Sequence, residues 1–278
     1  MRKDEMAKKT KGMTLKRQKN WLDRHLLSFE HEEIMYEPFW RVEDVRSSGI
    51  KTKIAHFSDP ERVMHLLSQN ELWMYLDIAQ NPNIIETYEQ FAIPLGFSIP
   101  IAKALGVKHP VYIGSNKVPI IQTIDFVSIR SDTTKVAHAV KQESDALRFR
   151  TQEKLAIQEA YCELENIDYQ LVTSTTLRTV KSENLEALFR HRNISPFMLS
   201  AFEMWLSNFL GCVSDDRHAR VSRILECSAQ VCGISYSQSV SFFYYSLWND
   251  HLGMDWSQRL KLEMAASDLG VCPNANVA

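Results

Sequence analysis

The sequence predicts an α/β domain with a mixed sheet, followed by a helical domain. Strand-like and helical segments alternate through residues 39–175, and this order builds a sheet with flanking helices. After Thr173 the composition turns helical, and a length of 278 residues suits two domains. We therefore expect the α/β domain over residues 39–175 and the helical domain over residues 176–278.

In the first domain, a helix is expected from Gln69 to Gln80, because Ser68 can cap it and Glu71 completes a capping box. The other expected elements are strands over 84–93, 120–129, 135–141 and 169–173 and a helix over 151–166. Residues 130–134 form the turn of a hairpin in which Ile129 pairs with Lys135. A strand that follows a helical crossover is expected to run parallel to an earlier strand.

The second domain is expected to be helical and to resemble a winged-helix or helix-turn-helix module. Four helices are expected, over residues 182–190, 195–210, 217–232 and 235–250. Gly233 lies in the turn between the last two, and residues 252–263 are a candidate wing. An ordinary helix pair remains the alternative, because many unrelated helix pairs share this pattern.

The composition is that of a soluble globular protein, with 45% hydrophobic and 24% charged residues. No run of eighteen apolar residues is present, and the charged N-terminus lacks the apolar segment of a signal peptide. The five cysteines are scattered without a CxxC pair, which is typical of free thiols in a reducing compartment. The sequence thus predicts a cytoplasmic protein without a membrane span.

The N-terminal segment is basic although the whole chain carries a net charge of −2. Residues 1–24 hold nine Lys or Arg against three acidic residues, and we expect residues 1–38 to form a basic arm. Such an arm is disordered in a free protein or neutralises phosphates, and the two interpretations are compatible. The candidate DNA contacts are Lys8, Lys9, Lys11, Lys16 and Arg17 in the arm and Lys108 and His109 in a later loop.

Three residues of the first domain form a candidate catalytic group. Asp125 stands in an apolar strand, where a carboxylate is costly to bury without a partner. With Ile129 paired to Lys135, Asp125 lies opposite Ala139, and Lys141 shares that face. Glu71 on the helix adds a second carboxylate.

This group suits metal-assisted phosphodiester hydrolysis. Two carboxylates bind hard cations such as Mg²⁺, which polarise a phosphate and activate a bound water. A lysine can orient that water and offset the charge of the transition state. The competing interpretation is that Asp125 and Lys141 form a salt bridge and that Glu71 only caps its helix.

Six segments in one order carry a resemblance to a known family. They are HLLSQNEL (65–72), EQF (89–91), GVKHP (106–110), TIDF (123–126), VK (140–141) and RTQEKL (150–155). In this order they resemble the TnsA endonucleases of Tn-seven-like heteromeric transposases, over about residues 38–175. The second domain is similar only in length and helix-turn-helix character.

The resemblance implies a restriction-endonuclease-like fold for the first domain. It also implies an activity, which is Mg²⁺-dependent nicking of DNA at the 5′ ends of a transposon, with Mn²⁺ as a substitute metal. The implied partners are a TnsB-type transposase, which cuts and joins the 3′ ends, and a TnsC-type AAA+ regulator, onto which the second domain docks.

The resemblance also assigns residues, with one departure. Glu71, Asp125 and Lys141 take the catalytic positions, and the Val140 carbonyl completes the metal shell. The family type has a glutamine two residues before the lysine, where this chain has Ala139. Candidates to replace its oxygen are Gln142, Gln158 and Glu159. Two alternatives are therefore kept: a catalytically weak or inactive subunit that bridges transposase and regulator, and a winged-helix DNA-binding regulator.

Overall fold

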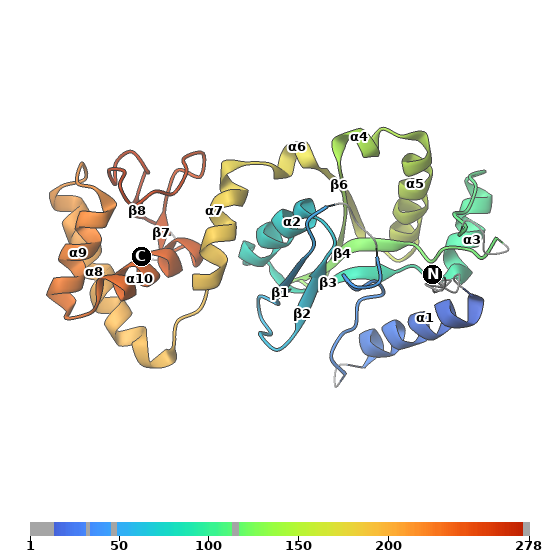
Figure 1. Cartoon of the computed structure of the whole chain (residues 1–278), viewed down its shortest axis with the longest axis horizontal. Coiled ribbons are helices and arrows are strands. Elements are labelled where there is room, and N and C mark those ends of the chain that lie inside the picture. The colour runs from blue at the N-terminus through green and yellow to red at the C-terminus, as the bar shows by residue number, and fades with distance from the viewer. Residues whose placement is uncertain (1–13, 32–33, 46–48, 113–116, 275–278) are drawn as a thin grey trace, which may run out of the picture. The chain divides into compact units, whose positions relative to one another are not determined.

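The computed structural model describes residues 14–31, 34–45, 49–112 and 117–274. The chain divides into two compact units, each of which is considered by itself (Figure 1). The first unit comprises residues 1–72 and 83–175, and the second comprises residues 73–82 and 176–278. No helix in the described part of the chain is long and apolar enough to cross a membrane.

The first unit is built on a four-stranded sheet. Its elements are α1 (Leu15–Glu30), β1 (Thr52–Ala55), β2 (Val63–Leu66), the first turn of α2 (Gln69–Gln80), β3 (Ile84–Ala92), α3 (Leu95–Ala104), β4 (Thr123–Arg130), β5 (Lys135–Lys141), α4 (Glu143–Ala146), α5 (Phe149–Leu164) and β6 (Asp168–Thr173). The strand order is β3-β4-β5-β6, and β1 and β2 form a separate two-stranded sheet. Strands β3, β4 and β5 are antiparallel neighbours, whereas β6 runs parallel to β5. The expected mixed sheet is thus confirmed, as is the pairing of Ile129 with Lys135.

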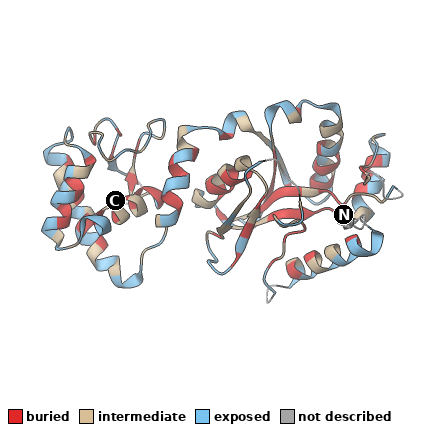
Figure 2. Cartoon of the chain, viewed as in Figure 1, coloured by how far each residue is buried: buried red, intermediate tan, exposed pale blue. Residues whose placement is uncertain are grey.

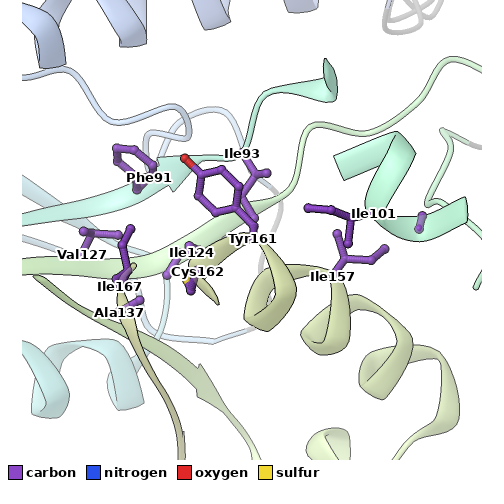
Figure 3. Packing of buried hydrophobic residues seen from close by; sticks show 11 residues of the cluster. Phe91, Ile93, Ile101, Ile124, Val127, Ala137, Ile157, Tyr161, Cys162 and Ile167 are labelled. Atoms are coloured by element: carbon purple, nitrogen blue, oxygen red, sulfur yellow. The ribbon is translucent and has the colours of Figure 1, made fainter. Parts of the chain in front are cut away.

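The core of this unit lies between the sheet and helices α3 and α5. Figure 3 shows Ile157, Tyr161 and Cys162 of α5 in one cluster with Ile124 and Val127 of β4. Burial is concentrated along the strands and on one side of each helix (Figure 2). Because apolar burial stabilises by roughly 25 cal/mol per Å², this packing holds the sheet that carries the candidate site.

Helix α1 differs from the expectation of a disordered arm. Thr14 caps the helix by accepting a hydrogen bond from the Arg17 N–H. Its buried residues are polar, namely Gln18, His25 and Ser28. The His25 ring donates from Nδ1 to the Glu37 carbonyl and accepts at Nε2 from the Ala92 N–H. Trp21, Leu22 and Phe29 of this helix also pack against buried apolar residues of the unit. Disorder is therefore the wrong expectation for residues 15–24, because hydrogen bonds and apolar contacts both attach this helix to the unit.

The second unit is helical, as expected. Beyond residues 73–80 of α2, it contains α7 (Val180–Leu188), α8 (Leu199–Asp215), α9 (Val221–Cys232) and α10 (Tyr236–Trp248), with short turns η1 (Phe189–His191) and η2 (Pro196–Met198); the four-residue helix α6 (Ser174–Leu177) crosses the division. Gly233 ends α9 with a φ of 65°, a conformation that favours glycine. The winged-helix expectation is not confirmed, since β7 (Leu252–Gly253) and β8 (Cys272–Pro273) have only two residues each.

Candidate active site

Asp125 lies where β4 and β5 stop pairing. The ladder between these strands runs from Ile129 and Lys135 to Phe126 and His138. Beyond that last pair, the Val140 N–H donates to Asp125 Oδ2 at 2.7 Å. The carboxylate is 8% exposed, and a buried carboxylate needs such donors to offset its lost hydration.

The Lys141 ammonium bridges two oxygens of this site. Its Nζ donates to Asp125 Oδ2 at 2.6 Å and to the Val140 carbonyl at 2.9 Å. These are two of the three groups that the resemblance assigns to the metal shell. The expected salt bridge is therefore present, and the same contacts show oxygens that converge on a cation.

Glu71 supplies the second carboxylate from the first turn of α2. Its Oε2 accepts from the Leu67 N–H at 2.9 Å, and its Oε1 accepts from Ser68 Oγ at 3.0 Å. Ser68 Oγ also accepts from the Glu71 N–H, so the predicted cap is formed. Glu71 is 7% exposed; burial and the neighbouring Asp125 carboxylate raise the pKa of its carboxyl to about 7. Two carboxyl groups therefore share one poorly hydrated region.

The donor set fits a hard divalent cation. All the candidate ligands are oxygens, and Asp125 Oδ1 makes no hydrogen bond with any residue that the structure describes. Within the described ranges no cluster of three or more His, Cys, Asp and Glu side chains is found. Two carboxylates and one carbonyl leave positions for water, which Mg²⁺ characteristically retains. Glu71, Asp125 and Val140 therefore fit Mg²⁺ or Mn²⁺.

Ala139 and its candidate replacements occupy different places. The Ala139 side chain is buried and offers no oxygen. Gln142 is exposed, and its Oε1 accepts from the side chain of Asn70, the neighbour of Glu71. Gln158 is buried, with its amide bonded to the Thr123 carbonyl and the Tyr169 hydroxyl. Glu159 lies on the exposed side of α5.

The candidate DNA contacts are spread over three places. Lys8, Lys9 and Lys11 lie outside the described residues. Lys16 and Arg17 are exposed on α1, where the Arg17 guanidinium lies 4.7 Å from the centre of the Trp21 ring.

Lys108 and His109 lie in the loop after α3. Lys108 is exposed, and its carbonyl accepts from the Arg150 guanidinium. The His109 ring bonds to Ser98 Oγ and the Pro110 carbonyl, and burial lowers its pKa below the usual value. Burial thus disfavours the charged form of His109, whereas the exposed Lys108 remains a candidate phosphate contact.

Gln90 contacts the candidate site, although the sequence pointed to it only within the segment EQF and assigned it no role. Its Nε2 donates to Glu71 Oε2 at 3.3 Å, and its Oε1 accepts from Thr123 Oγ1 at 2.9 Å. The feature that points to Gln90 is its position opposite Asp125 when β3 and β4 are aligned. That register is known only from the folded sheet.

Comparison with known proteins finds a similar family over part of the chain. Residues 81–174 match the family model of the TnsA-like endonuclease N terminal domain. The Transposon Tn7 transposition protein TnsA of Escherichia coli is 31% identical over 156 residues, which cover 55% of this chain and 56% of that relative. The match thus spans about half the length of the curated relative. The family match includes Asp125 and Lys141, whereas Glu71 precedes it. The resemblance inferred from the sequence is confirmed: the chain is TnsA-like, and residues 81–174 are similar to the N-terminal endonuclease domain of that family.

Proposed function

We propose that this chain is a Mg²⁺-dependent DNA endonuclease that nicks the 5′ ends of a transposon during cut-and-paste transposition. One observation carries the proposal. Two carboxyls, Glu71 and Asp125, are buried, and burial together with the Asp125 charge raises the pKa of Glu71; the Lys141 ammonium already bridges Asp125 and the Val140 carbonyl. In an endonuclease-type domain, this arrangement suits a metal-dependent phosphodiester hydrolase.

Each residue has a defined role in the proposed reaction. Glu71, Asp125 and the Val140 carbonyl hold the cation. Bound Mg²⁺ supplies polarisation of the scissile phosphate and a lowered pKa for a coordinated water. Lys141 orients the attacking water and offsets negative charge that develops on the phosphate. The low exposure of both carboxyls strengthens these electrostatic effects.

The proposed assembly includes transposon-end DNA, a TnsB-type transposase and a TnsC-type AAA+ regulator. The name of the Escherichia coli relative supports a role in transposition. Exposed Lys16, Arg17 and Lys108 are the described residues we propose as phosphate contacts. The affinity for DNA would then come in part from the partner subunits, consistent with a net charge of only −2.

The substitution Asp125→Ala tests the proposal in a complete transposition reaction, with the two strands analysed separately. We expect 5′-strand cleavage to fall by roughly 10²–10³-fold or more, because the substitution removes a metal ligand and the partner of Lys141. Joining of the 3′ ends should persist. Asp132→Ala is a matched control, since Asp132 is an exposed carboxylate in the β4–β5 turn. Unchanged 5′ cleavage by Asp125→Ala would refute the proposal.

A catalytically weak or inactive bridging subunit is the second candidate, and Ala139 favours it. The buried methyl group of Ala139 gives the site one oxygen fewer than a glutamine would. A crystal soaked in Mn²⁺ separates the candidates. An ordered ion between Glu71 and Asp125 supports the nuclease, whereas an empty position at millimolar Mn²⁺ supports the bridging subunit.

A further inference from the structure

Gln90 occupies a special position beside Asp125. The β3–β4 ladder pairs Glu89 with Phe126 and Phe91 with Ile124, and it skips the level at which Gln90 and Asp125 lie. On the other side of Asp125, Ala139 is the β5 residue at the same level, one position past the pair of Phe126 and His138. Asp125 is therefore flanked by an amide side chain from β3 and a methyl group from β5.

The backbone of Gln90 is held in an unusual conformation. Its φ is 49°, in the left-handed region that residues other than glycine rarely adopt. Its carbonyl accepts from the Phe39 N–H, outside the β3–β4 ladder. Such conformations persist where the surrounding structure determines them, and they are enriched at functional sites.

The side chain of Gln90 joins Glu71 to β4. Its amide nitrogen faces the Glu71 carboxylate and its amide oxygen faces the Thr123 hydroxyl, which is the orientation that satisfies both partners. Gln90 is 3% exposed, so these bonds form away from bulk water. The Glu71 oxygen that accepts from Gln90 also accepts from the Leu67 N–H. Two fixed donors thus set the direction of this carboxylate.

We propose that Gln90 is a positioning residue of the metal site. Its amide holds the Glu71 carboxylate in the orientation that binds the divalent cation. The site thus receives a polar side chain from β3, through Gln90, whereas the residue at the same level of β5, Ala139, has no polar group in its side chain. The proposal rests on the proposed function, because it concerns the same cation.

Calorimetric titration of the full chain with Mn²⁺ tests the proposal directly. Gln90→Leu keeps the approximate size of the side chain and removes both hydrogen bonds. We expect its Mn²⁺ affinity to fall about 10- to 100-fold, the usual effect of losing a residue that orients a metal ligand. Gln122→Leu is the matched control: Gln122 is also buried, and its amide nitrogen has no partner among the described residues. The Mn²⁺ affinity of Gln122→Leu should change less than about twofold.

A second variant separates side-chain positioning from backbone strain. Asn adopts positive φ more readily than Gln, but it is one methylene shorter and does not reach Glu71. Gln90→Asn should therefore still fold cooperatively, as judged by thermal unfolding, and yet bind Mn²⁺ more weakly. Wild-type Mn²⁺ affinity in Gln90→Asn overturns the positioning role.

A functional readout completes the test. In the assembled transposition reaction, the Mn²⁺ concentration for half-maximal 5′ cleavage should rise in Gln90→Leu by the same factor as the dissociation constant. If the wild type binds Mn²⁺ but Gln90→Leu binds it equally well, only the positioning role fails. If the wild type does not bind Mn²⁺, or binds it no more tightly than Asp125→Ala does, the proposed metal site and the role of Gln90 fail together.

Discussion

The two units of this protein bury different kinds of polar group. In the first unit, the buried side chains include Arg62, Glu71, Glu89 and Asp125. In the second unit, the buried polar residues among those described are neutral: Ser182, Asn184, Ser228, Ser239 and Ser246. A buried charge requires a partner or another compensating interaction. The first unit therefore contains charged interactions that a purely apolar core would not need. The core of the second unit, by contrast, is rich in aromatic side chains.

Within the first unit, buried charge occurs in two arrangements. The Arg62 guanidinium bonds to Glu86 at 2.9 Å and to Glu89 at 2.7 Å, and it stacks on Tyr36. That group is charge-paired and suits a structural role. Glu71 and Asp125 are instead two carboxyls near each other, with one ammonium between Asp125 and a carbonyl. The charge pairing of Arg62 thus suits stabilisation of the fold, whereas the two carboxyls of Glu71 and Asp125 suit the binding of a cation.

The largest effect on stability is expected in the aromatic core. Trp205 is 0% exposed, and its indole N–H donates to Ser239 Oγ at 2.7 Å. Trp205→Ala should lower the free energy of unfolding of the second unit by about 3–5 kcal/mol, because it leaves a large cavity. Urea denaturation followed by fluorescence measures this loss. Phe197→Ala is the control at a 96% exposed aromatic and should change stability by less than about 0.5 kcal/mol.

The structural charge pair should respond almost as strongly. Arg62→Met leaves Glu89 buried without its main partner and should destabilise the first unit by about 3 kcal/mol. The double variant Arg62→Met with Glu89→Gln should recover part of that loss, because no uncompensated charge remains. Urea denaturation of both variants checks this. A single variant as stable as the wild type would contradict a structural role for the pair.

A smaller effect should appear as pH dependence from His25. Burial lowers the pKa of His25 to about 4, despite the hydrogen bond to the Glu37 carbonyl, which raises it. The unfolded chain therefore binds the proton first, and stability falls as pH drops from about 6.5 towards 4. His25 should contribute a loss of about 2 kcal/mol by pH 5. Chemical denaturation across this range should show a shallower decline in His25→Gln than in the wild type; equal slopes would contradict the prediction.

The smallest expected effect has the opposite sign. In metal-free protein, Glu71→Gln removes a charge that burial and Asp125 disfavour, and it should raise the free energy of unfolding by about 1 kcal/mol at pH 8. A carboxyl with a raised pKa is protonated in the folded state at low pH, so the gain should vanish near pH 5. Thermal unfolding in a chelating buffer at both pH values measures it. If Glu71→Gln is instead less stable than the wild type at pH 8, Glu71 stabilises the fold as Arg62 does, and the contrast between the two arrangements is wrong.

Prediction succeeded where the local pattern carries the information. The boundaries of α2, Gln69 and Gln80, match the expectation because a cap and an apolar face define that helix. The β4–β5 register also matches, because the turn and the alternation of side chains determine it. Helix α1 was missed because the basic composition of residues 1–24 favours a disordered arm, and because the most buried residues of the helix, Gln18, His25 and Ser28, are polar.

The sequence by itself determined helices α2 and α5 and the strands β3 to β6, the candidate trio of Glu71, Asp125 and Lys141, and the resemblance to the TnsA family. These depend on short-range periodicity, on capping and on residue type. Tertiary structure alone decided that the Asp125 charge acts on the Glu71 carboxyl, that the Lys141 ammonium bridges Asp125 and the Val140 carbonyl, and that Gln90 donates to Glu71. The physical reason is that these contacts link residues far apart in the chain, so they exist only after the sheet and α2 are packed.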